Sequence, residues 1–184
     1  MENAIRLEGD VVTLRDFNLE DTDDVLKIAG DDRVTHWLSY DSRDRDGVRA
    51  MLEGAVNRAQ QVPRNEYYLA IVGPSGDNVI GFCRLGLSGV QAGKLGYALA
   101  PSEWGKGYAT DAARTLIQFG FRDLGLHRIS AAIGPDNAQS IKLVEALGFT
   151  REGVLRDHVF TNGAWRDSVL YSLLEPEWTA AEER

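Results

Sequence analysis

The sequence predicts a mixed α/β domain in which helices pack on a mostly antiparallel sheet of about seven strands. Its first half contains β-branched and apolar runs joined by short turn signals, which is typical of an antiparallel meander. A strand-helix-strand-helix order follows, and the turn Thr161-Asn162-Gly163 then joins the last two strands as a hairpin. A chain of 184 residues can bury one core and is short for two domains. We therefore expect a single domain over 1–184, with its core at about 11–175 and a frayed tail at 180–184.

The individual elements follow from local signals read in chain order. Asn18 and Asp21 form a capping-box pattern that opens a first helix, and an apolar stripe predicts a second helix at 45–59. The same helical spacing predicts helices at 109–124 and 138–147. Strands are expected at 11–15, 67–72, 79–87, 94–100, 128–133, 151–160 and 164–174.

Charge and composition restrict the class of partner. The formal net charge is −8, which disfavours binding to nucleic acid or to an anionic membrane and favours cationic partners such as amines or basic peptides. No apolar run reaches the roughly 18–20 residues of a membrane-spanning helix, and the first residues lack the pattern of a secretory signal. The single cysteine, Cys83, excludes an intramolecular disulfide, so a cytoplasmic location is expected.

A glycine-containing loop at 104–109 carries the main functional signal. Gly105 and Gly107 follow a predicted strand and precede a predicted helix, so the backbone can approach a ligand closely there. The unpaired amides and the partial positive charge of a helix N-terminus bind phosphate, and Lys106 adds a cation. The sequence therefore predicts a phosphate-bearing ligand at this loop.

Two familiar phosphate-binding patterns do not fit the loop. The Walker pattern requires Ser or Thr directly after Gly-Lys, whereas Lys106 is followed by Gly107. The dinucleotide pattern requires a third small residue where the chain has Thr110, and Asp136 lies too far along to bind the ribose. The acetyl-CoA loop is the third candidate, and here the flanking residues agree as well.

Three motifs in the right order closely resemble the GNAT acetyltransferases, and most of all the subgroup related to RimJ and RimL, which acetylate ribosomal-protein N-termini. The first runs from Leu95 through the glycine loop to Ala112. The others are the segment 137–149, containing Asn137-Ala138-Gln139-Ser140 and Ala146-Leu147-Gly148-Phe149, and the segment 152–173 around Asn162-Gly163 and Trp165. The resemblance implies the GNAT fold, with helices on both faces of a twisted sheet that is splayed between the fourth and fifth predicted strands.

The resemblance also implies residues that bind acetyl-CoA, the acyl donor. In such proteins the strand before the loop pairs with the pantetheine arm and the loop amides hold the pyrophosphate. No metal is implied. The corresponding residues here are Tyr97, Ala98, Leu99, Trp104, Gly105, Lys106, Gly107, Tyr108, Ala109, Thr110, Asn137 and Lys142.

The chemistry implied by the resemblance is direct transfer of an acetyl group to an amine in a ternary complex. Ser140 would protonate the departing thiolate, although Asn137 and Ser140 also suit the N-cap and first turn of a helix. Asp157 and His158, each acting through water, are both candidates for the general base. The resemblance does not decide between them, since Lys94 occupies a position where many relatives have a carboxylate. The acceptor is a small-molecule or peptide amine, and the protein is a monomer or a homodimer. An acyl-CoA-binding regulatory module without turnover is the alternative.

Other reactive residue types have simpler interpretations. Cys83 alternates with Gly81 and Leu85 along a strand, so we expect a core residue rather than a nucleophile. His36 and His127 lack partners at metal-ligand spacing. Trp37 and Tyr40 either line the acceptor pocket or pack in the interior.

Overall fold

The centre of the protein is one eight-stranded sheet. The computed structural model describes residues 4–76 and 78–182. The strand order is β1-β2-β3-β4-β5-β6-β8-β7, and all neighbours are antiparallel except β5 and β6, which are parallel. The strands are β1 (Arg6–Glu8), β2 (Thr13–Asp16), β3 (Glu66–Val72), β4 (Val79–Leu87), β5 (Ala92–Leu99), β6 (Arg128–Ile133), β7 (Thr150–Thr161) and β8 (Ala164–Leu174).

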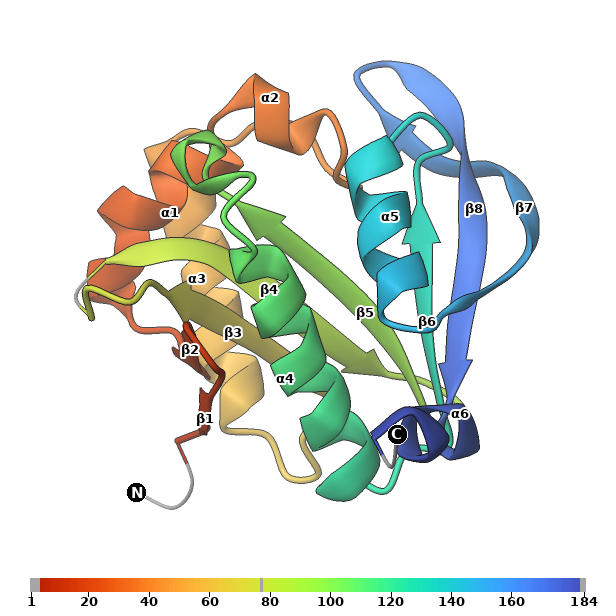
Figure 1. The fold of residues 1–184 in the computed structure, drawn as a ribbon. Helices are drawn as coiled ribbons and strands as arrows, with labels where there is room; N and C mark the ends of the chain where they lie inside the picture. The colour runs from red at the N-terminus through yellow and green to blue at the C-terminus, as the bar shows by residue number, and fades with distance from the viewer. Residues whose placement is uncertain (1–3, 77, 183–184) are drawn as a thin grey trace.

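Helices cover both faces of this sheet, as expected (Figure 1). Helices α1 and α3 pack on one face, and α4 and α5 pack on the other. The helical segments are η1 (Leu19–Asp21), α1 (Thr22–Ala29), α2 (Asp32–Thr35), α3 (Arg45–Ala59), η2 (Pro101–Glu103), α4 (Tyr108–Arg122), α5 (Ala138–Ala146) and α6 (Glu175–Glu182). No helix in the described ranges is long and apolar enough to cross a bilayer.

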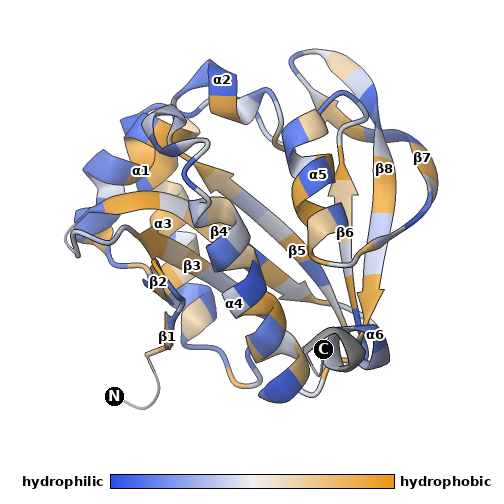
Figure 2. Cartoon of the chain, viewed as in Figure 1, coloured by the Kyte–Doolittle hydropathy of each residue, from blue (hydrophilic) through white to orange (hydrophobic). Residues whose placement is uncertain are grey.

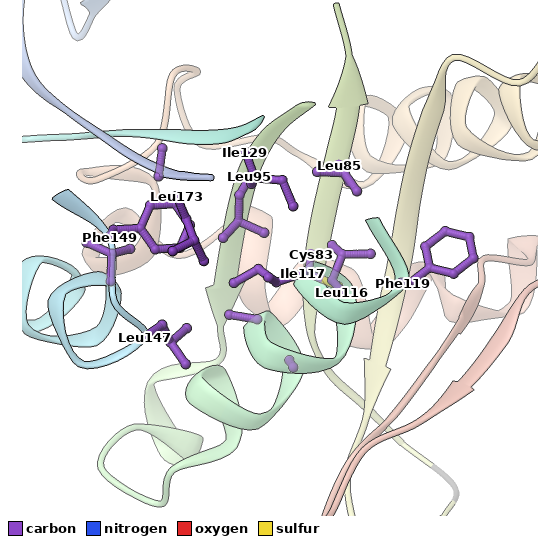
Figure 3. Packing of buried hydrophobic residues seen from close by; sticks show 14 of the residues in the cluster. Cys83, Leu85, Leu95, Leu116, Ile117, Phe119, Ile129, Leu147, Phe149 and Leu173 are labelled. Carbon is purple, nitrogen blue, oxygen red and sulfur yellow. The ribbon is translucent and has the colours of Figure 1, made fainter. Parts of the chain in front are cut away.

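Alternation along the strands divides the interior into two cores. Leu69 and Ile71 of β3 join the core beneath α4, whereas Ala70 between them joins the core beneath α1 and α3, because successive side chains of a strand point to opposite faces. Leu116 and Ile117 of α4 are fully buried among Leu85, Leu95 and Ile129 of the sheet (Figure 3). Figure 2 shows hydrophobic and hydrophilic residues alternating along α4, which is the pattern of a helix with one buried side.

The sheet opens between β5 and β6, and this opening forms the site. The two strands pair only where Ala92–Lys94 lie beside Arg128–Ser130. Beyond Lys94 they diverge towards their carboxyl ends (Figure 1), while each stays paired along its other edge, β5 with β4 and β6 with β8. The splay between the fourth and fifth predicted strands is therefore confirmed, because those strands are β5 and β6.

Two expectations about the ends of the chain need correction. The sheet has eight strands rather than about seven, because Arg6–Glu8 pairs with β2 as an edge strand too short to leave a periodic signal. The tail expected at 180–184 continues α6 as far as Glu182, and residues 183–184 lie outside the described part of the chain. This helix is held because Trp178 is buried, with its ring centroid 6.3 Å from that of Phe121.

Candidate active site

The loop between β5 and α4 has the conformation that its glycines allow. Gly105 and Gly107 have φ angles of 75° and 82°, in the left-handed region that favours glycine. Trp104 Nε1 donates a hydrogen bond to the Leu99 carbonyl at 3.0 Å, which fastens the loop to the end of β5. Gly107 is the N-cap of α4, so no side chain caps this helix and its first amides face outward for a ligand.

A cavity of about 900 Å³ lies over this helix start and is named here the helix-terminus cavity. It is lined by all but one of the residues predicted to bind acetyl-CoA. The exception is Lys106, whose Nζ instead forms an ion pair with Glu103 Oε2 at 3.0 Å. The lining members of the predicted set are Tyr97, Ala98, Leu99, Trp104, Gly105, Gly107, Tyr108, Ala109, Thr110, Asn137 and Lys142.

A second cavity, of about 760 Å³, lies on the other side of the gap between β5 and β6. It is named here the hairpin cavity, because β7 and β8 form one wall and the segment 36–39 after α2 forms another. Six of the described residues line both cavities: Trp37, Leu38, Tyr97, Asp136, Asn137 and Ser140. A ligand that enters from the α4 side can therefore meet a second ligand from the hairpin side at these residues.

Hydrogen bonds link Tyr97, Asn137 and Ser140. The Asn137 side chain caps α5 by accepting a bond from the Ser140 amide, and the Tyr97 hydroxyl lies 3.5 Å from the Ser140 carbonyl oxygen. Burial raises the pKa of Tyr97 to about 12, and a hydrogen bond from Ser140 opposes that shift. Tyr97 is therefore a neutral hydrogen-bond donor at neutral pH, and the capping role expected as one interpretation of Asn137 is present.

The two candidate bases lie in different environments. His158 lines the hairpin cavity, and its Nδ1 lies 2.9 Å from the hydroxyl oxygen of the buried Ser168. Asp157 lines neither cavity; its backbone amide donates to Asp167 Oδ1 at 2.9 Å and its φ angle is 47°. A β-bulge between Leu155 and Val159 breaks the alternation of β7 at this point, and of the two candidate bases only His158 lines the cavity.

The remaining candidates also separate by position. Cys83 is fully buried, and burial raises its pKa, so it is a protonated core thiol. Trp37 lines both cavities, whereas Tyr40 lines neither and has the Arg43 guanidinium 4.7 Å from its ring centroid. His36 lines the hairpin cavity. Within the described ranges, no three His, Cys, Asp or Glu side chains are grouped to hold a metal ion.

Sequence reasoning missed several residues of the hairpin cavity. Arg84, Trp165, Arg166 and Ser168 line it, yet none was predicted as a site residue, although the last three lie in the family motif at 152–173. The only signal that could have found Arg84 is its place among apolar residues of a central strand. Arg166 has a structural role in the cavity wall. Its guanidinium donates hydrogen bonds to the His36 and Leu38 carbonyls and so links β8 to the segment after α2.

Known proteins are similar to this chain in sequence and fold. The family described as acetyltransferase (GNAT) domain matches residues 12–150. The chain is 35% identical to an uncharacterized N-acetyltransferase, p20, of Bacillus licheniformis, over 91% of this chain and 94% of that protein. It is 34% identical to the ribosomal protein uS5-alanine N-acetyltransferase of Escherichia coli, over 61% of this chain and 60% of the relative.

Solved structures agree on the architecture. Mycobacterium smegmatis RimJ, crystallised in complex with CoA-disulfide, superimposes with a TM-score of 0.79 at 23% identity, over 97% of this chain and 94% of that one. Three findings together identify the family: the glycine loop, the splayed strands and the family match over more than half of the sequence. The chain belongs to the GNAT family of acetyltransferases.

Proposed function

We propose that this acetyltransferase transfers the acetyl group of acetyl-CoA to a primary amine by direct attack in a ternary complex. The acceptor is the α-amine of a protein N-terminus or an amine of a small molecule. The observation that carries the proposal is that the helix-terminus cavity and the hairpin cavity share Tyr97, Asn137 and Ser140. Donor and acceptor can thus approach the same point from opposite sides of the sheet, without a covalent enzyme intermediate.

The donor would lie in the helix-terminus cavity. The first amides of α4 suit its pyrophosphate, since an uncapped helix N-terminus attracts anions. The exposed edge of β5 beyond Lys94 suits the pantetheine arm, because its backbone groups lack a partner strand on that side. Lys142, at the rim of this cavity, adds a cation near the phosphates.

The reaction needs an acid for the leaving group. The amine nitrogen attacks the thioester carbonyl carbon, and the carbon–sulfur bond breaks. The departing thiolate takes the proton of the Ser140 hydroxyl, and Ser140 regains a proton from the acylated nitrogen, so that the amide and the free thiol are formed. A hydrogen bond to a developing anion lowers the barrier because it strengthens as charge accumulates. The backbone amide of Ser140 is already used by the Asn137 cap, so the hydroxyl is not needed for that bond.

The amine must also lose a proton. An α-amine with a pKa of about 8 is partly neutral at physiological pH, so a modest base suffices. His158 serves as this base through a water molecule. Its Nδ1 is bonded to Ser168, and its Nε2 forms no bond to any described residue. We assign this role to His158 rather than Asp157, because only His158 lines the hairpin cavity.

The first acceptors to test are peptides that begin with alanine, the residue named for the Escherichia coli relative. Purified protein is mixed with acetyl-CoA and each peptide, and free thiol is followed with time. Acceptor-dependent thiol release, together with a rise in Tm on adding acetyl-CoA but not NAD, is the expected result. A rise in Tm without thiol release from a broad panel of amines would instead indicate an acyl-CoA-binding module. We expect the reaction to take place in the cytoplasm. A sedimentation measurement distinguishes a monomer from a homodimer.

A further inference from the structure

An unpaired ammonium group lies on the floor of the hairpin cavity. The side chain of Lys94 is exposed on β5 and lines this cavity, and its ammonium group forms no hydrogen bond or ion pair with any described residue. In a chain of net charge −8, most exposed cations have a carboxylate neighbour, as Lys27 and Lys106 do. A cation without a partner inside a cavity is available to a ligand.

A second cation lies beside it on the neighbouring strand. The β4–β5 register sets Gly86 opposite Lys94 and Arg84 opposite Gly96, so all four positions share one face of the sheet. The Arg84 guanidinium folds over Gly86, where an added Cβ would lie 3.1 Å from Nη2. An added Cβ at Gly96 would have no atom within 4 Å, so the floor next to both cations is open.

The nearby carboxylates do not neutralise this floor. Glu66 pairs with Arg84, but it is shared with Arg58, so two guanidinium groups face one carboxylate. Asp136 and Asp167 line other walls of the cavity, and neither forms an ion pair with Arg84 or Lys94. The floor formed by Arg84 and Lys94 therefore carries a net positive charge.

We propose that this cationic floor binds a carboxylate of the acceptor, so that the preferred substrate is an amine carrying a carboxylate several bonds from its nitrogen. The inference rests on the proposed function, which brings the reacting amine to Tyr97 and Ser140. Lys94 precedes Tyr97 by three residues, a separation of about 10 Å along a strand. A carboxylate on the residue after an N-terminal amine, or at the far end of an amino acid with a long side chain, suits this spacing.

Matched peptides test the proposal. We compare H-Ala-Glu-NH2 with H-Ala-Gln-NH2, which differ by one charge, in the thiol-release assay at low ionic strength. The wild type is expected to favour the Glu peptide by about five-fold in kcat/KM, mainly through KM, with a smaller ratio at high salt. The pair 4-aminobutyrate and butylamine distinguishes a free amino acid from a peptide as the source of the carboxylate.

Substitutions assign the preference to the floor. Lys94→Met is expected to bring the Glu/Gln ratio to about one, and Lys94→Glu to reverse it, because the charge that selects the carboxylate is removed or inverted. Lys27→Met is the matched control, since it removes the same charge from α1, away from both cavities, and keeps the wild-type ratio. Lys94→Gln repeats the test should the Met variant fold poorly.

Two results would overturn the inference: a ratio of one in the wild type, or an unchanged ratio in both the Met and Gln variants. Failure of the proposed function looks different, because no peptide would then release thiol. In that case calorimetry with the CoA-loaded protein still measures the affinities of the two peptides. Equal affinities for the wild type would reject the cationic floor independently of turnover.

Discussion

Asn137 Oδ1 accepts a hydrogen bond from the backbone amide of Ser140 at 3.2 Å, and this bond caps α5 at the point where the two cavities meet. The donor is the Ser140 backbone, so the Ser140 hydroxyl has no part in the cap. The Asn137 side chain, in contrast, is the cap itself. Substitutions at the two positions therefore separate stability from chemistry.

Ser140→Ala is expected to lower turnover by about 10- to 100-fold, because the leaving thiolate loses its proton donor. The free energy of unfolding should change by no more than about 0.5 kcal/mol, since alanine keeps the capped amide. Thiol release measures the first effect and urea unfolding the second, with the acetyl-CoA Kd nearly constant. Ser102→Ala, on the exposed turn η2, is the matched control. Equal turnover in wild type and Ser140→Ala would reduce Ser140 to a backbone donor.

Asn137→Ala is expected to lower the free energy of unfolding by about 1 kcal/mol, because the first turn of α5 loses its side-chain acceptor. Asn137→Asp keeps that acceptor and should restore most of the stability. A carboxylate cannot donate a hydrogen bond. If the Asn137 amide group contacts acetyl-CoA, the affinity of the Asp variant for acetyl-CoA should therefore stay below that of the wild type even though its stability is restored. Urea unfolding and calorimetry give the two values, and full affinity in the Asp variant would limit Asn137 to capping.

Asp111 links the functional helix to the N-terminal segment. Its buried carboxylate accepts the backbone amides of Asp10, Val11 and Val12 at 3.0, 2.8 and 2.9 Å. Asp111→Ala should cost about 2–4 kcal/mol of unfolding free energy, because it leaves these donors without an acceptor. Asp10→Ala is the control, since its side chain is exposed and forms only a 3.8 Å ion pair with Arg114. A loss below about 1 kcal/mol at Asp111 would show that water replaces the carboxylate.

Local periodicity was sufficient to predict most of the fold. The bounds of α3, β4 and β6 were predicted to the residue, because each has an uninterrupted apolar pattern between clear turn signals. Strand β1 and helix α6 were missed because tertiary contacts define them: β1 exists through its pairing with β2, and α6 through the burial of Trp178. Such contacts leave little trace in a window of one sequence.

The site was predictable where it depends on backbone conformation. Gly105 and Gly107 are required at positive φ, so the loop that precedes α4 could be located from the position of these glycines between a predicted strand and a predicted helix. The hairpin cavity was not predictable, because the bulge in β7 changes which side chains face it and separates His158 from Asp157. The position of Lys106 was also missed, since its pairing with Glu103 depends on the turn η2.

Glu152 should make stability depend on pH in acid. Hydrogen bonds from Arg128 and then Ser172 lower its pKa from 4.5 to about 2, with Arg128 binding both carboxylate oxygens. Because the folded-state pKa lies below the unfolded value, this contribution is complete above about pH 4.5 and is lost as the pH falls towards 2. Both side chains are about one-third exposed, so solvent screening limits it to about 1 kcal/mol.

Glu152→Gln tests this contribution without changing the size of the side chain. At pH 7 the variant should be less stable than the wild type by up to about 1 kcal/mol, and most of the difference should be lost as the pH falls to 2, where about half of the wild-type carboxylate is protonated. Urea unfolding at a series of pH values measures the difference. Arg128→Met should produce a similar loss, and the double variant should lose less than the sum, because each single change already breaks the pair. A difference that stays constant from pH 7 to 2 would assign the effect of Glu152 to packing instead of charge.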